Sequence, residues 1–306
     1  MLSGGGPVGR HVASLLLERG DHVVIGTRSG RDTGAVGATY ISLDATDTAA
    51  LTRAADGAAG LFNTANPGDY PVWEKLWPPM ASALLAAAEA TGAVYAMTGN
   101  LYPIGPVTVP MTEDLPNGAR EHKGVLRARI WEDALTAHQA GRIRAFEVRS
   151  SDWIGGGLGH ISRVLPAALA GRTVRMIGRV DMPHSYTDVR DAARTLVAVF
   201  DDPDSYGSIW HVPGRPPRTQ TEVIGDLMDT AGRPRVAVKG TPPMLLNALG
   251  VVSPMAREVA QLSYQLTRPY ILDGSAVERR LGITPSDWND SLRRTLDELA
   301  GPGARL

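Results

Sequence analysis

Three glycines near the start of the chain are spaced as in a turn that binds phosphate groups. Gly4, Gly6 and Gly9 lie in Ser-Gly-Gly-Gly-Pro-Val-Gly, and an amphipathic segment over residues 8–19 follows them. This spacing permits a tight turn, a close approach of the backbone to a pyrophosphate, and close packing of helix on strand. The helix start offers free N–H groups to the phosphates. The alternative is a glycine-rich turn without a ligand. The predicted dinucleotide site comprises Gly4, Gly6, Pro7, Val8 and Gly9.

The strand that should precede this turn is short. Only Met1, Leu2 and Ser3 stand before Gly4, whereas a strand usually has about five residues. Two interpretations stay open: the chain starts several residues late, or the central strand is truncated.

The end of the second predicted strand indicates which dinucleotide is bound. Thr27 and Arg28 stand there, and Thr27 lies 18 residues after Gly9, close to the position that reads the ribose. A carboxylate would repel a 2′-phosphate, whereas a hydroxyl and a guanidinium would bind it, and Arg31 could add to the pocket. We therefore favour NADP as the cofactor, with NAD as the alternative. Arg28 as a solvated loop residue is the other interpretation.

Composition excludes several classes of protein. The chain has 306 residues with 43% hydrophobic and 21% charged residues, and its formal net charge is −1. This charge does not favour a nucleic acid or an anionic membrane as partner. No apolar run is long enough to span a membrane, and no signal peptide opens the sequence, so we expect a cytoplasmic protein. The absence of cysteine and the scattered positions of the seven histidines predict no metal site.

Strand-like and helix-like segments alternate through the first half of the chain. The pattern predicts an α/β fold of Rossmann type, a doubly wound parallel sheet. We expect the long third helix to start at Pro78-Pro79, because proline fits the first turn of a helix. The predicted strands are 23–27, 39–43, 60–63, 93–98, 143–149 and 208–212, and the predicted helices are 8–19, 47–55, one ending near 91, 123–140, 162–170 and 188–200.

The pattern loosens after residue 154. We expect a dinucleotide-binding domain over residues 1–154 and a substrate-binding lobe over residues 155–306. The lobe should be small and mostly helical, with late strands returning to the sheet. A cleft between the two parts would hold the ligand.

Further motifs follow in order along the chain: Asp44-Ala45, Phe62-Asn63-Thr64-Ala65, Met97-Thr98-Gly99-Asn100-Leu101-Tyr102, Arg149-Ser150-Ser151-Asp152-Trp153-Ile154-Gly155, His184-Ser185-Tyr186-Thr187-Asp188-Val189-Arg190-Asp191 and Leu281-Gly282-Ile283-Thr284-Pro285. Together with the glycine turn, they resemble the extended and atypical short-chain dehydrogenase/reductases, the NAD(P)-dependent epimerase/dehydratase family. The resemblance runs nearly from end to end. It implies an NAD(P)-dependent enzyme with a small-molecule substrate, and a homodimer formed through the helices after the fourth and fifth strands.

The resemblance also implies roles for single residues. The implied cofactor contacts are Asp44 and Ala45 at the adenine and Asn63, Thr64 and Ala65 beside the pyrophosphate, and the implied substrate contacts are Asp152, Trp153 and Tyr186. Thr98 ends a strand at the carboxyl edge of the sheet, where α/β proteins place their chemistry, and is our first catalytic candidate. Tyr102 would bond a substrate carbonyl or simply pack.

The chain departs from the family at the catalytic pair. The family places Tyr-x-x-x-Lys about 25 residues after the position of Thr98, but Lys123 and Arg127 stand at the two positions here. Three interpretations stay open. In the first, Lys123 replaces the tyrosine as acid and base. In the second, both cations bind an anionic group of substrate or cofactor, with Lys123 also a cofactor contact, while Tyr102 or a substrate group handles the proton. In the third, both line a solvated helix face.

Three functions follow from these alternatives. The first is an NADP-dependent oxidoreductase acting on a small organic carbonyl or alcohol. The second is an epimerase or isomerase that retains its cofactor. The third is a regulator that senses NADP without catalysis, for which loss of the tyrosine would be the natural signature.

Overall fold

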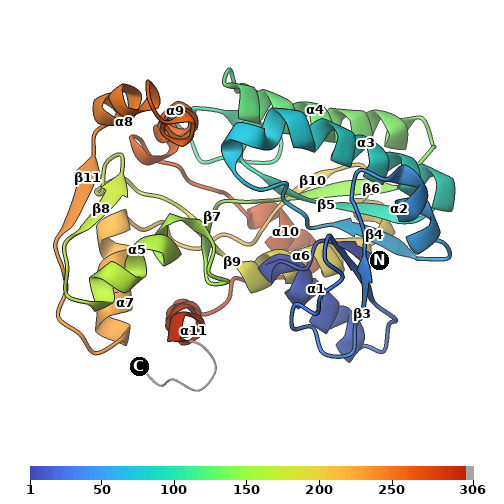
Figure 1. Ribbon diagram of the computed structural model, residues 1–306, viewed down its shortest axis with the longest axis horizontal. Helices are drawn as coiled ribbons and strands as arrows, with labels where there is room; N and C mark the ends of the chain where they lie inside the picture. The colour runs from blue at the N-terminus through green and yellow to red at the C-terminus, as the bar shows by residue number, and fades with distance from the viewer. Residues whose placement is uncertain (301–306) are drawn as a thin grey trace.

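A seven-stranded parallel sheet forms the centre of the computed structural model, which describes residues 1–300 (Figure 1). Its strand order is β10-β6-β5-β4-β1-β2-β3. The order reverses between β1 and β4, and in such sheets ligands bind in the crevice at the carboxyl ends of these strands. The strands are β1 (Leu2–Ser3), β2 (Val24–Thr27), β3 (Thr39–Ser42), β4 (Gly60–Asn63), β5 (Val94–Asn100), β6 (Ala145–Ser150) and β10 (Ile209–His211).

Helices cover both faces of this sheet (Figure 1). On one face lie α1 (Pro7–Glu18) and α6 (Val189–Phe200), whose buried side chains share one apolar cluster. On the other face, α2 (Thr48–Ala54), α3 (Trp73–Thr91) and α4 (His122–Gln139) share a second cluster. The doubly wound α/β fold expected from the sequence is therefore confirmed.

The central strand β1 is only two residues long. Leu2 pairs with Ile25 on one side and with Phe62 on the other, and its side chain is fully buried. Pairing on both edges stabilises this short strand directly before the glycine turn.

The predicted start of α3 was wrong. Pro78 and Pro79 lie inside the helix, which begins at Trp73 after the short 3₁₀-helix η1 (Tyr70–Val72). Tertiary packing explains the difference, because the indoles of Trp73 and Trp77 are buried in the first turns and the Trp73 indole donates to the Gly68 carbonyl. Pro78 and Pro79 are the sixth and seventh residues of the helix, so each removes one intrahelical hydrogen bond, a cost that the packing of the two indoles offsets.

The C-terminal part forms a separate cluster beside the sheet. Its apolar core joins helices to two small parallel sheets, β7-β9 and β8-β11. One late strand returns to the main sheet, since β10 pairs with β6. The elements here are β7 (Asp152–Ile154), α5 (Gly159–Leu169), β8 (Val174–Ile177), β9 (Tyr186–Asp188), α7 (Gln220–Thr230), β11 (Val238–Thr241), α8 (Pro243–Gly250), α9 (Pro254–Gln261), α10 (Ser275–Leu281) and α11 (Trp288–Ala300).

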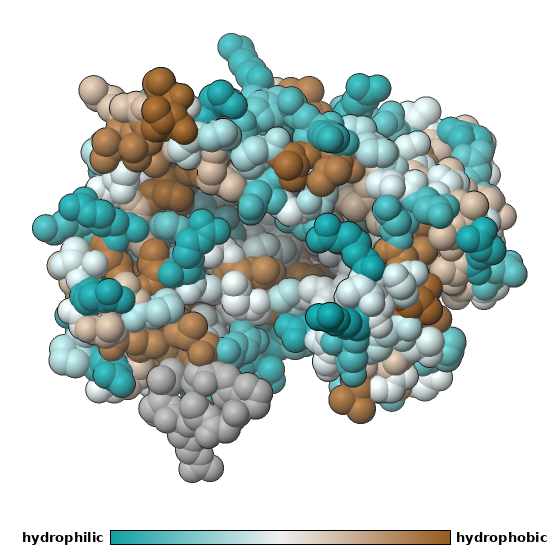
Figure 2. All heavy atoms as spheres, viewed as in Figure 1, coloured by the Kyte–Doolittle hydropathy of each residue, from teal (hydrophilic) through white to brown (hydrophobic). Residues whose placement is uncertain are grey.

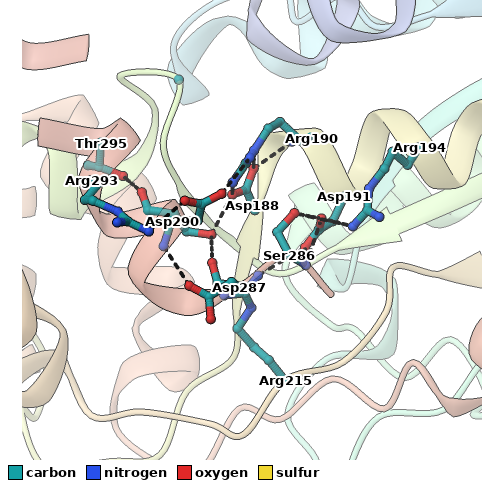
Figure 3. A network of polar contacts seen from close by, with 12 residues as sticks. Asp188, Arg190, Asp191, Arg194, Arg215, Ser286, Asp287, Asp290, Arg293 and Thr295 are labelled. Atoms are coloured by element: carbon teal, nitrogen blue, oxygen red, sulfur yellow. Dashed lines mark hydrogen bonds and ion pairs between the residues drawn. The ribbon is translucent and has the colours of Figure 1, made fainter. Parts of the chain in front are cut away.

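A polar network ties α6 to the last helices (Figure 3). The Asp188 carboxylate accepts from the backbone N–H of Arg190, at 2.9 Å, and from the Ser291 hydroxyl, at 2.6 Å. Asp191 accepts from the backbone N–H of Ser286 and from Arg215. These charged hydrogen bonds fix the C-terminal part against the sheet, because buried carboxylates need such partners.

Candidate active site

The glycine turn has the geometry that its spacing predicts. Gly4 has a φ of +111°, and a Cβ there would lie 2.8 Å from the backbone of Ala65. A Cβ on Gly9 would lie 2.2 Å from the carbonyl oxygen of Gly4. A Cβ on Gly6, by contrast, meets no described atom within 4 Å. Two glycines are thus needed for close packing, and Gly6 leaves the surface at the start of α1 open, as a bound phosphate requires.

The segment after β4 closes the turn from the other side. The Thr64 hydroxyl lies 3.0 Å from the carbonyl oxygen of Gly4 and 3.2 Å from that of Ser3. Asn63 is buried, and its amide donates to the Tyr95 hydroxyl at 3.1 Å. The structure therefore brings the predicted residues of this segment to the turn, with Thr64 as the group that fastens it.

The end of β2 and the loop behind it form a hydroxyl-rich and basic corner. The Thr27 and Thr33 hydroxyls are buried and have no hydrogen-bond partner within residues 1–300. A Cβ on Gly5 would lie 2.5 Å from the Thr33 hydroxyl, so this loop folds back onto the glycine turn. Arg10 donates to the Thr33 carbonyl at 3.1 Å, and Arg28 is exposed beside the corner.

The sequence analysis missed Thr33 and Arg10. No local pattern marks them, because only the fold of the loop between β2 and β3 brings them to the turn. Asp44, the residue implied at the adenine, is also nearby. Hydrogen bonds from Thr46 hold the pKa of its carboxyl below the ordinary range, and the charge of Arg28 lowers it further.

Thr98 lies near the carboxyl end of β5, which continues two residues further than predicted, to Asn100. Its hydroxyl is buried and without a partner in the described part of the chain, while its carbonyl accepts from Arg127 at 2.7 Å. The Arg127 guanidinium lies 4.4 Å from the centre of the Trp77 ring and 3.7 Å from the Glu147 carboxylate. Burial lowers the pKa of Arg127. Arg127 therefore supports the strand that carries Thr98.

Lys123 is fully buried, and its ammonium has defined partners. Its Nζ lies 2.5 Å from Oε2 of Glu258 and donates to the carbonyl of the same residue at 3.2 Å. It also lies 5.4 Å from the centre of the Tyr70 ring, within the range of a cation–π contact. The interpretation of Lys123 and Arg127 as a solvated helix face was wrong, because α9 covers the first residue and the sheet the second.

Two tyrosine hydroxyls meet next to Lys123. The hydroxyls of Tyr70 and Tyr102 are 2.7 Å apart, and the Tyr102 ring stacks on Trp73. Burial raises the pKa of Tyr70 to about 12 and that of Tyr102 well above its usual value. Both phenols are therefore protonated at neutral pH and can donate a proton or a hydrogen bond.

Asp152 begins β7, and its charge acts on the tyrosine pair. Burial is the first cause that raises the pKa of Tyr70 and of Tyr102, and the charge of Asp152 adds to it. Its Oδ2 lies 3.0 Å from Nε2 of His184, whose ring packs between Tyr186 and Tyr270 with centroids 5.1 Å away. Burial opposes ionisation of Asp152, but the hydrogen bond and charge of His184 lower its pKa.

Trp153 and Tyr186 join Asp152 around a small cavity that is lined by residues 152–266. Figure 2 shows the surface hollowed between the sheet and the C-terminal helices. The sequence analysis missed Tyr70, His184 and Glu258. His184 lay in a quoted motif, but nothing local marked the other two.

A parallel sheet that carries a glycine turn at its switch point defines a dinucleotide-binding α/β protein. The model of the NAD dependent epimerase/dehydratase family matches residues 1–212, and the chain belongs to this family of enzymes. A search of curated proteins found no significant match.

Several solved structures have the same fold. MoeE5 in complex with UDP-glucose and NAD superposes with a TM-score of 0.78 at 20% identity, covering 97% of each chain. DesIV, a dTDP-glucose 4,6-dehydratase from Streptomyces venezuelae with NAD bound, gives 0.78 at 18%, covering 99% of this chain and 97% of the other. UDP-glucose 4-epimerase from Thermotoga maritima gives 0.78 at 18%, covering 96% of each. At these identities the likeness shows the fold alone.

Within residues 1–300, none of the helices combines the length and the apolar character needed to cross a bilayer.

Proposed function

We propose that the protein is an NADP-dependent oxidoreductase acting on a small organic carbonyl or alcohol. The observation that carries the proposal is the open surface at Gly6 beside a basic corner. A Cβ on Gly6 meets no described atom within 4 Å, and Arg28 stands where an acidic residue would read an unphosphorylated ribose. The unpartnered hydroxyls of Thr27 and Thr33 are suited to a phosphate in this corner.

Cofactor and substrate would divide between the two parts of the chain. Residues 1–154 would hold the cofactor and residues 155–306 the substrate. The pyrophosphate would lie at the start of α1, and the adenine near Asp44 and Ala45. The contacts of Thr64 with Gly4 support this arrangement, because they preform the turn.

The chemistry would take place at the carboxyl end of β5. The cofactor would supply or accept the hydride. The Thr98 hydroxyl, which has no partner within residues 1–300, would donate a hydrogen bond to the substrate oxygen. Tyr102, hydrogen-bonded to Tyr70, would handle the proton of that oxygen, with Lys123 as the alternative group. Asp152, with Trp153 and Tyr186 beside it, would face the substrate.

A second candidate is an epimerase that oxidises and re-reduces its substrate without releasing the cofactor. Family membership favours it, and solved structures with this fold carry UDP-glucose with NAD or the name UDP-glucose 4-epimerase. Net consumption of NADPH would indicate the first candidate, and tightly retained NAD without net redox change would indicate the second. A homodimer through α3 and α4 is compatible with either.

A fluorescence titration with NADPH and NADH tests the cofactor proposal. Wild-type protein should bind NADPH more tightly. Arg28→Ala should weaken NADPH binding about tenfold, the loss of roughly 1.4 kcal/mol of charged hydrogen bonding, and leave NADH binding unchanged. Arg53→Ala, an exposed arginine on α2, is the control. Equal weakening of both cofactors by Arg28→Ala would contradict the proposal.

A further inference from the structure

Helix α9 reaches across from the C-terminal part and covers the start of α4. Its contact residue is Glu258, whose side chain is 8% exposed. The Glu258 carboxylate lies 2.5 Å from Nζ of Lys123 and 2.8 Å from Nε2 of His122. Its backbone carbonyl accepts a second hydrogen bond from Lys123 at 3.2 Å. One residue of α9 therefore holds two consecutive residues of α4, although 135 positions separate it from Lys123.

These contacts fix where the Lys123 ammonium points. The Glu258 carboxylate from α9 contacts the ammonium directly. Glu121 holds the backbone of the same residue, because its carboxylate caps the start of α4 through the N–H groups of Lys123 and Gly124. On the remaining side, the face of the Tyr70 ring lies 5.4 Å away. The ammonium has no exposed surface and, unlike the buried hydroxyl of Thr98, already has protein partners, so it does not contact a ligand in this arrangement.

Tyr70 connects this buried ion pair to the candidate chemistry. Its hydroxyl lies 2.7 Å from that of Tyr102, while its ring receives the charge of Lys123. A cation over an aromatic ring fixes the ring by electrostatic attraction, which is stronger where water is excluded. The ion pair thus orients the tyrosine pair without reaching the substrate side.

We propose that Glu258 is a positioning residue of the active site, and that Lys123 acts through Tyr70 instead of touching the substrate. The proposal rests on the proposed function only for the identity of the reaction. It removes Lys123 from the candidates for proton transfer, and it makes the site incomplete without α9.

Amine labelling tests this proposal, because the chain has three lysines. Lys75 and Lys239 are exposed and serve as internal standards, and Lys123 is fully buried. Folded protein is treated with an acetylating reagent, with and without saturating NADPH, and each lysine is followed by peptide mass spectrometry. Lys123 should react at least about 100-fold more slowly than Lys75 in both states, because its exposure requires local opening.

Variants of Glu258 give the second arm. Glu258→Gln should raise the labelling rate of Lys123 at least about tenfold and leave Lys75 and Lys239 unchanged, because local opening becomes easier. Glu258→Asp keeps the carboxylate and should restore most of the protection. The matched control is Glu89→Gln, which removes a carboxylate from an exposed pair with Arg142 and should change none of the rates.

Several results would overturn the proposal. If Lys123 of the wild-type protein were labelled as fast as Lys75, α9 would not shield it from the reagent. This result alone would overturn the proposal, without any variant. Fast labelling only with NADPH bound would show that Lys123 reaches into the loaded site. Full protection in folded Glu258→Gln would remove the role of Glu258. If Glu258→Gln does not fold, the wild-type arm and Glu258→Asp decide.

The same samples separate this proposal from the proposed function. NADPH binding is followed by the change in its fluorescence. If neither NADPH nor NADH binds while the labelling pattern holds, the cofactor assignment fails and the Glu258–Lys123 contact stands. If NADPH binds and Lys123 is freely labelled, the cofactor assignment stands and the proposal for Glu258 and Lys123 fails.

Discussion

Replacement of Gly6 by alanine separates cofactor binding from folding. Gly6 has a φ of −69° and a ψ of 179°, which any residue adopts, and a Cβ there meets no described atom within 4 Å. Gly6→Ala should therefore leave the free energy of unfolding of the cofactor-free protein within about 0.5 kcal/mol of wild type. The new methyl group would, however, stand where the pyrophosphate approaches the backbone.

The expected loss of binding can be worked out from one phosphate contact. A hydrogen bond to a charged group contributes about 1.5–3 kcal/mol, or roughly 10- to 100-fold in Kd. At NADPH concentrations 100 times the wild-type Kd, bound cofactor stabilises the protein by about 2.7 kcal/mol. A variant with 100-fold weaker binding retains about 0.4 kcal/mol of this stabilisation.

Urea unfolding with and without NADPH measures both quantities. Gly9→Ala is the matched comparison, since its Cβ would lie 2.2 Å from the Gly4 carbonyl oxygen and 2.6 Å from the Thr64 hydroxyl. Such overpacking should destabilise the cofactor-free protein by about 1–3 kcal/mol. If NADPH stabilised the Gly6→Ala variant as much as it stabilises the wild-type protein, this placement of the pyrophosphate would be refuted.

Three further predictions concern stability. Glu258→Gln should lower the free energy of unfolding in urea by about 3–5 kcal/mol, because it leaves a buried ammonium unpaired. Adding Lys123→Met to the same chain should recover most of the lost stability. A loss below about 1 kcal/mol in Glu258→Gln would contradict the burial of the pair. Burial lowers the pKa of His211 to about 4 from 6.5, so the unfolded chain takes up the proton first, and stability should fall by up to about 3 kcal/mol between pH 6.5 and 4. His211→Asn should show a flatter pH profile in thermal unfolding, and an unchanged profile would rule out this histidine as the cause. Thr64→Val should cost about 1–3 kcal/mol, because the Gly4 carbonyl loses its partner, and should weaken NADPH binding in the same titration; wild-type values for both would argue against the fastening role.

The order of strands and helices could be predicted because each depends on local pattern. The glycine turn, the apolar strands and the alternating helices lie within a few residues of where the sequence placed them. The start of α3 could not be predicted, because the buried indoles of Trp73 and Trp77 outweigh the preference of Pro78 for a first turn.

The candidate site could be predicted only in part, because some of its contacts depend on residues that are distant in the sequence. Thr98 ends a predicted strand and Asp152 follows the end of another by three residues, so their positions at the sheet edge follow from topology. The environment of Lys123 depends on Glu258, which lies 135 residues later in a helix that carries no motif. Spacing on α4 alone was equally consistent with a solvated face and with a buried ion pair.

The most direct test of the central claim is a calorimetric titration of the wild-type protein with NADPH and, separately, with NADH. The account predicts one site per chain and a Kd for NADPH that is at least about tenfold lower, a difference of roughly 1.4 kcal/mol. Tighter binding of NADH would contradict the assignment of Thr27 and Arg28 to a 2′-phosphate. Absence of binding for both would contradict the cofactor site itself.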